Sequence, residues 1–245
     1  YWEIGNEFNM DSFLHPRNYY STKTPFTLDE KAQIVTEMCF AASRAIHKAN
    51  PDATVIFPGM APEGGFTVME KFLDLVYCGI ESGGNGSTDP DDYFDAVAWH
   101  CYIFKKFDIE KWVGYNNAVY AVMQKHGEGD KRVFLTEFGF SDGGKQAADA
   151  EQGGYLTQIY EACRTRMPYV DSVYPRQPPH GEALSRYTTV CSGSSVCRNS
   201  GQRKRQRRCA GATAETLKAL ICISETIRCI RGSFRSRSAK VQKTE

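Results

Sequence analysis

The chain has 245 residues, 41% hydrophobic and 12% aromatic, which is enough for the packed core of one large domain or slightly more. No apolar run approaches the roughly 18 residues of a membrane-spanning helix, and no signal-peptide pattern opens the sequence. The formal net charge of +1 conceals two different parts: residues 1–174 hold 15 Lys and Arg against 25 Asp and Glu, whereas residues 175–245 hold 15 against 4. Because the chain begins with Tyr1 inside an apparent strand, we interpret it as a fragment whose N-terminus is missing, and both secretion and a cytoplasmic location stay open.

In chain order, residues 1–174 alternate between predicted strands and predicted helices. Strands are expected to end near Glu7, Phe57, His100, Glu137 and Tyr174, and helices are expected over residues 28–50, 67–78, 109–126 and 147–167. Such alternation requires a parallel sheet with helical crossovers, which is either doubly wound or closed into a barrel.

Two observations favour the barrel. The strand ends follow one another at intervals of about 50, 43, 37 and 37 residues, as the units of a (β/α)₈ barrel do, and polar residues stand at several of them. A doubly wound nucleotide binder should carry a glycine-rich turn between strand and helix, and neither residues 83–86 nor residues 143–144 have the required spacing. We therefore predict an α/β fold, an incomplete (β/α)₈ TIM barrel over residues 1–174.

Two of the predicted strands have the same build, an apolar run that ends in a glutamate. Residues 1–7 (YWEIGNE) end in Asn6 and Glu7, and residues 132–139 (RVFLTEFG) carry Glu137. A single glutamate at a strand end is more often a solvated or helix-capping residue. Two of them at barrel spacing favour a functional pair, because cleavage of a glycosidic bond requires two carboxyl groups.

Three segments in this order resemble the signatures of clan A glycoside hydrolases, the retaining (β/α)₈ enzymes that include families 5, 39 and 51: residues 2–7 (WEIGNE), 99–102 (WHCY) and 135–139 (LTEFG). The resemblance covers residues 1 to about 174 and implies that they are strands four to eight, the C-terminal part of the catalytic barrel. It implies a glycoside hydrolase that cleaves O-glycosidic bonds of β-linked poly- or oligosaccharides by a retaining double displacement. By this resemblance Glu7 is the acid/base and Glu137 is the nucleophile.

The same resemblance and the chemistry of the reaction suggest further site residues. Asn6 is expected to bind the sugar 2-hydroxyl, Tyr102 to donate a hydrogen bond to Glu137, and His100 to line the sugar site or orient a neighbour. Trp99 and Phe138 are also candidate substrate contacts, although packing in the core is the favoured alternative for both. Other aromatic residues placed to stack on sugars are Phe8, Tyr19, Tyr20 and Phe140. The two-carboxylate mechanism requires no metal or other cofactor, and the expected partner is a carbohydrate.

After Tyr174 the alternation stops. Residues 175–245 contain no Asp, Trp or Met and are rich in Arg, Ser and Cys, so we predict a basic tail that is disordered or the product of a reading-frame shift. The basic run at 203–208 would suit a phosphate backbone. Without a surrounding basic fold or interleaved aromatic residues, nucleic-acid binding is not favoured.

Two alternatives concern the whole chain and its cysteines. Half a barrel leaves sheet edges open, so the alternative to an active enzyme is a catalytically inactive fragment or a carbohydrate-binding remnant. Cys39, Cys78, Cys101 and Cys163 lie in apolar surroundings without metal-like spacing, and we predict buried free thiols at all four.

Overall fold

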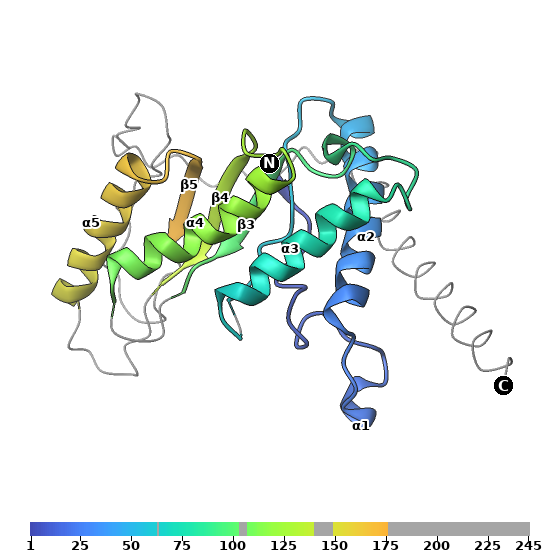
Figure 1. Cartoon of the computed structure of the whole chain (residues 1–245), viewed down its shortest axis with the longest axis horizontal. Helices are drawn as coiled ribbons and strands as arrows, with labels where there is room; N and C mark the ends of the chain where they lie inside the picture. The colour runs from blue at the N-terminus through green and yellow to red at the C-terminus, as the bar shows by residue number, and fades with distance from the viewer. Residues whose placement is uncertain (63, 103–106, 140–148, 176–245) are drawn as a thin grey trace, which may run out of the picture.

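The computed structural model describes residues 1–62, 64–102, 107–139 and 149–175, and the side chains of 149–152 are not described (Figure 1). Within these ranges one parallel sheet contains β1 (Trp2–Glu3), β2 (Val55–Ile56), β3 (Ala96–His100), β4 (Arg132–Phe138) and β5 (Val170–Pro175). The spatial order of the strands is their order in the chain, β1-β2-β3-β4-β5. The predicted α/β fold with a parallel sheet is confirmed. The tail predicted at 176–245 lies outside the described residues.

The four long helices lie where the hydrophobic periodicity predicts them: α2 (Leu28–Ala49), α3 (Phe66–Glu81), α4 (Ile109–Lys125) and α5 (Asp149–Thr165). α2 begins with a capping box, in which Thr27 Oγ1 accepts from the Glu30 N–H at 3.2 Å and the Thr27 N–H donates to Glu30 Oε2 at 2.8 Å. Two short helices, α1 (Tyr19–Thr22) and the 3₁₀ turn η1 (Pro90–Asp92), fall in segments that the periodicity left as loops. None of the described helices is both long and apolar enough to span a membrane.

The helices pack on one face of the sheet. Val97, Trp99 and Leu135 belong to one large core cluster that also contains residues of all four long helices. The alternate strand residues Ile56, Ala96, Ala98 and Phe134 form a small separate cluster on the other face, as the period of two in a strand requires. A doubly wound sheet carries helices on both faces and reverses its strand order at one point. The described part of this chain does neither, because its order is sequential and α3 and α4 lie together in front of the sheet (Figure 1).

Two expectations differ from the structure. The first strand was expected to run to Glu7 but has only two residues, because Gly5 adopts a φ of 89° that no strand can continue through. Cys39, Cys101 and Cys163 are buried as predicted, but Cys78 is exposed. Cys78 directly follows the fully buried Tyr77 on α3, so the helical turn directs its thiol away from the core.

Candidate active site

Glu7, His100 and Glu137 meet at the carboxyl ends of β1, β3 and β4. A carboxylate oxygen of Glu7, a ring nitrogen of His100 and a carboxylate oxygen of Glu137 all lie within 4.8 Å of one another. Retaining glycosidases hold their two carboxyl groups about 5–5.5 Å apart, whereas inverting ones need about 6.5–9.5 Å to admit a water molecule. The approach of Glu7 and Glu137 is therefore compatible with direct attack by one carboxylate, the arrangement of a retaining enzyme.

Glu7 reaches this position through an unusual turn after β1. Its φ of 51° lies in the left-handed region, which costs a residue with a side chain about 1–3 kcal/mol and is retained mainly where the surroundings enforce it. The enforcing contacts come from the neighbouring strand: the Glu7 N–H donates to the Gly59 carbonyl at 2.8 Å, and Asn6 forms a parallel bridge with Gly59. Gly5 is equally restricted, since a Cβ there would lie 2.1 Å from Cε2 of Phe8.

His100 is the partner of Glu7. It ends β3 on the same face as Ala96 and Ala98, and its side chain is 1% exposed. Its Nδ1 and Oε1 of Glu7 share a hydrogen bond of 2.6 Å. The backbone of His100 is also held in place, because its N–H donates to the Met60 carbonyl at 2.7 Å. A buried imidazole held this way fixes the direction of the Glu7 carboxyl group.

Glu137 has a different partner. The Tyr102 hydroxyl donates to Oε2 of Glu137 at 2.5 Å, the contact that the sequence suggested. The irregular pairing of β3 with β4 places His100 opposite Glu137, and the Cys101 N–H donates to the Glu137 carbonyl at 3.0 Å. Each carboxyl group thus has its own orienting side chain, an imidazole for Glu7 and a phenol for Glu137.

Beside these residues lies a third carboxyl group, Glu3, that the sequence reading did not assign to the site. Its Oε1 accepts from the Gly59 N–H at 2.9 Å and from the Thr136 hydroxyl at 3.1 Å. The backbone of Gly59 passes between this oxygen and His100: a Cβ on Gly59 would lie 2.4 Å from His100 Nε2 and 2.6 Å from Glu3 Oε1. The sequence signal for this close approach was Pro58-Gly59 at a strand end, which could have been read as a position that tolerates no side chain.

The surroundings of Glu3 lead to a test by pH. Much of the residue is exposed, but protein atoms around its carboxyl end displace water and raise the pKa of Glu3 above its usual range, and the nearby Glu137 adds to the rise. The Gly59 N–H, the Thr136 hydroxyl and His100 oppose it. The folded state therefore binds the carboxyl proton of Glu3 more tightly than the unfolded state does. The stability that this proton contributes is full below the ordinary glutamate pKa of about 4.3, and it is lost as the pH rises through the pKa of Glu3 in the folded state.

We therefore expect Glu3→Gln, whose amide oxygen can still accept both hydrogen bonds, to raise the free energy of unfolding at neutral pH relative to the wild type. The gain should disappear as pH falls below about 4. Urea denaturation at several pH values measures it, and Glu161→Gln, an exposed change on α5, is the control. A gain that persists unchanged at low pH would show that the charge of Glu3 is not its source.

The remaining predicted site residues lie in two different environments. Asn6 is half-buried beside Gly59, within the turn that carries Glu7. Trp99 and Phe138 differ from the expected role as substrate contacts, because both side chains are fully buried in the helix-side core. The Trp99 indole N–H donates to Oδ1 of Asn116 at 2.7 Å. A ring with no exposed face cannot stack on a sugar, so these two residues support the sheet.

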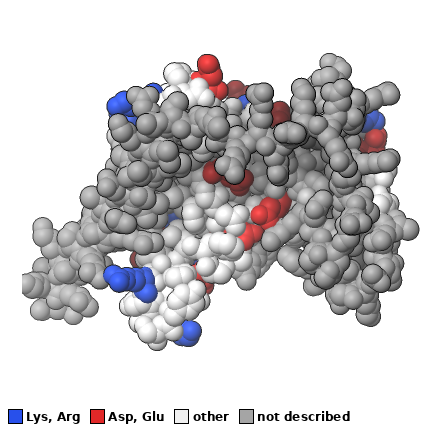
Figure 2. Space-filling view, turned by 180° about the vertical axis from the view of Figure 1, so that it is seen from behind, with Lys and Arg blue, Asp and Glu red and all other residues white. Residues whose placement is uncertain are grey.

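The aromatic residues that were expected to stack on sugars differ in how far they are exposed. Tyr20 is 67% exposed and its ring contacts those of His15 and Tyr19, each with centroids about 5 Å apart, whereas Phe8 packs against the core. Phe140 lies outside the described residues. Figure 2 shows the face opposite α3 and α4, where acidic side chains lie near the middle and both acidic and basic ones lie at the margins.

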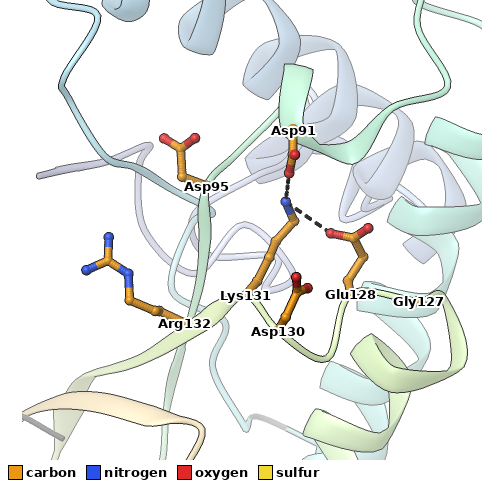
Figure 3. Close-up of a pocket in the computed structure, with 7 residues that line it drawn as sticks. All are labelled: Asp91, Asp95, Gly127, Glu128, Asp130, Lys131 and Arg132. Atoms are coloured by element: carbon orange, nitrogen blue, oxygen red, sulfur yellow. Dashed lines mark hydrogen bonds and ion pairs between the residues drawn. The ribbon is translucent and has the colours of Figure 1, made fainter. Parts of the chain in front are cut away.

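A pocket lined mainly by charged side chains lies at the amino ends of β3 and β4 (Figure 3). The nearly buried ammonium group of Lys131 forms ion pairs there with Asp91 and with Glu128, the latter at 3.0 Å. Asp95 precedes β3 and Arg132 opens β4, so this pocket lies at the opposite end of the strands from Glu7 and Glu137. Because Lys131 is paired with two carboxylates, Asp95 with His47 and Arg132 with Asp171, we assign the pocket a structural role.

Comparisons with known proteins add one similarity. No family model matches the chain, and no curated protein matches it either. Among solved structures, a glucosidase from Croceicoccus marinus is similar over 72% of this chain and 32% of its own, with 21% sequence identity and a TM-score of 0.48. This chain therefore spans about a third of that protein. Similarity of this extent assigns neither an activity nor a fold family.

Proposed function

We propose that the chain is part of a retaining glycoside hydrolase whose five described strands are strands four to eight of a (β/α)₈ barrel. The observation that carries this proposal is the approach of Glu7 and Glu137 to within 4.8 Å at the carboxyl ends of parallel strands, each with its own orienting partner. The sequential strand order, with helices on one face, supports the barrel. The resemblance of residues 2–7, 99–102 and 135–139 to clan A supports the reaction.

In this mechanism Glu137 attacks the anomeric carbon while Glu7 gives its proton to the leaving oxygen. Tyr102 holds the attacking carboxylate, and His100 holds Glu7 against the glycosidic oxygen. The first step forms a covalent glycosyl ester on Glu137. In the second step Glu7, now a carboxylate, takes a proton from water, whose oxygen displaces Glu137 and restores the original configuration. Asn6, which precedes Glu7 in the same turn, is the proposed donor to the sugar 2-hydroxyl.

Beyond Glu7 and Glu137, we propose a class of substrate and one surface that contacts it. A β-linked poly- or oligosaccharide is the expected substrate class. The exposed ring of Tyr20, which contacts the half-buried ring of Tyr19, offers an apolar surface in the segment that follows Glu7. A panel of aryl β-glycosides with different sugars would identify the sugar that the chain accepts.

Trapping the glycosyl ester tests the proposal. A 2-deoxy-2-fluoro aryl glycoside slows both steps and, with a reactive leaving group, should leave one sugar attached to the 245-residue chain, measured by mass spectrometry of the intact protein and its peptides. We expect the label on Glu137, none on Glu137→Gln, and normal labelling of the surface variant Glu161→Gln.

Other outcomes of the trapping experiment separate the alternatives. A label on another carboxyl group would overturn the assignment of Glu137. Turnover with inverted product configuration would overturn the retaining mechanism. A chain that folds but shows neither turnover nor labelling with any sugar of the panel would support the inactive fragment or carbohydrate-binding remnant instead.

A further inference from the structure

A second cluster of ligand-type side chains lies where α3 passes the end of α4, and it shares no residue with the candidate active site. Asp74 and Cys78 are one turn apart on α3, and His126 is the C-cap residue that directly follows α4. A carboxylate oxygen of Asp74, Sγ of Cys78 and a ring nitrogen of His126 all lie within 4.8 Å of one another. Three different donor types from two helices thus converge on one point.

The imidazole of His126 is already oriented. Its side chain is 5% exposed, and the ring stacks on Tyr77 with centroids 4.9 Å apart and an interplanar angle of 20°. Nδ1 lies 2.5 Å from Oε1 of Glu81, and Nε2 lies 2.7 Å from Oδ1 of Asp74. Nε2 thus shares a hydrogen bond with Asp74, and a metal ion would take the place of the proton between them. With Nδ1–H donating to Glu81, the lone pair of Nε2 would then be directed at the ion, which is the usual arrangement of a metal-binding histidine.

The electrostatic setting attracts a cation. α3 ends at Glu81 and α4 at Lys125, so two helix C-termini with their partial negative charge lie near the cluster. Asp74 and Glu81 add two carboxylates. Asp74 now pairs with the cation of Lys125, whose Nζ lies 2.6 Å from Oδ1 of Asp74. The exposed Cys78 thiol gives access from solvent.

We propose that Asp74, Cys78 and Nε2 of His126 bind a zinc ion, with Glu81 orienting His126 and a water molecule completing a tetrahedral site. Sulfur, nitrogen and carboxylate oxygen together are the donor set that Zn²⁺ accepts. A thiolate ligand disfavours Mg²⁺ and Ca²⁺, which prefer oxygen. Binding releases the thiol proton of Cys78 and leaves Nε2 of His126 without a proton. The proposal does not depend on glycosidase activity.

Titration of the metal-free 245-residue chain with Zn²⁺, by calorimetry or by competition with a chromophoric chelator, tests the site. We expect one zinc ion per chain and loss of this binding in Cys78→Ser. Glu81→Gln, which removes the carboxylate behind His126, should weaken binding about 10- to 100-fold. Lys125→Gln should tighten it about two- to fivefold, because it removes the competing ammonium group.

Co²⁺ substitution identifies the sulfur ligand directly, since a thiolate bound to Co²⁺ gives a charge-transfer absorption in the near ultraviolet. We expect this absorption in the wild type and in a variant whose cysteines after residue 175 are all serine, and its absence in Cys78→Ser. Those cysteines are Cys191, Cys197, Cys209, Cys222 and Cys229.

Glu137→Gln is a further control, because Glu7, His100 and Glu137 form the other group in the described residues that could hold a metal ion. Zinc binding that is unchanged by Cys78→Ser, or lost in the serine-tail variant or Glu137→Gln, would overturn the proposal. Circular dichroism of each variant separates loss of binding from loss of fold.

Discussion

Replacing Glu7 by alanine is expected to lower kcat about 10²- to 10⁴-fold for glycosides with poor leaving groups, the usual contribution of a general acid or base. Glycosides of strongly acidic phenols need no proton on the leaving oxygen, so their first step should be almost unaffected. The glycosyl ester should then accumulate, because Glu7 is also the proposed base that activates water in the second step. The result is a low kcat with a low KM for such substrates.

Azide separates this role from a general loss of structure. The small anion can enter the space left by the Glu7 side chain and attack the glycosyl ester without a base. We therefore expect azide to restore turnover of Glu7→Ala with an activated aryl glycoside and to give a glycosyl azide of the same anomeric configuration as the substrate. Product analysis by NMR and rate measurements with and without azide check it.

Two controls define what this experiment shows. Glu161→Ala removes an exposed carboxyl group of α5 that pairs with Arg164 one turn away, and should neither lose activity nor respond to azide. Glu137→Ala removes the proposed nucleophile, and azide entering that space should attack from the opposite side and give the inverted product. If Glu7→Ala yields the inverted azide, the roles of the two glutamates are exchanged.

The sequence predicted the long elements well because their signals are local. The four long helices each carry an apolar stripe at helical spacing, and the strands are short apolar segments with polar residues at their ends. Glu7, His100, Tyr102 and Glu137 were identifiable because each stands at or just beyond a strand end, and parallel strands bring those ends together.

The parts that the sequence did not predict depend on contacts between distant segments. Glu3 was interpreted as part of an apolar run, and its place beside Glu7 and Glu137 arises only where Gly59, which follows β2, and Thr136 of β4 meet it. Trp99 alternates along β3 with Ala98 and His100, so its side chain belongs to the helix side, but a preference for aromatic residues near sugars drew it into the predicted site. Cys78 was judged by its apolar neighbours in sequence, although the turn of α3 exposes it.

Gly59→Ala is expected to be nearly as damaging as the loss of a catalytic group, although Gly59 carries no functional side chain. The added Cβ would lie 2.4 Å from Nε2 of His100 and 2.6 Å from Oε1 of Glu3, and real Cβ contacts are not that short. The Glu3 carboxyl group is the end of a flexible, largely exposed side chain and can move aside. His100 is 1% exposed and has no such freedom, so its ring must shift.

In the proposed mechanism, a shift of His100 would act on catalysis through the 2.6 Å hydrogen bond to Glu7. Misplacement of a catalytic group by about 1 Å can cost about 10²-fold in rate, and we expect a loss of this size in kcat with a small change in KM. The matched control is Gly114→Ala on α4, where a Cβ meets nothing within 4 Å. That variant should keep full activity and gain roughly 0.5–1 kcal/mol in the free energy of unfolding, because alanine is the better helix former.

A double variant decides which of the two contacts matters. Glu3→Ala removes the clash with the carboxyl group but leaves the clash with the imidazole, so Glu3→Ala/Gly59→Ala should remain as inactive as Gly59→Ala. Recovery of kcat in the double variant would show that Gly59 acts through Glu3 and Thr136 on β4, and thus on Glu137. Unchanged kcat in Gly59→Ala itself would mean that the sheet can open at β2 without moving His100. Because β2 has only two residues and pairs with β3 through Ile56 and Ala96, thermal unfolding of each variant shows whether that opening has occurred.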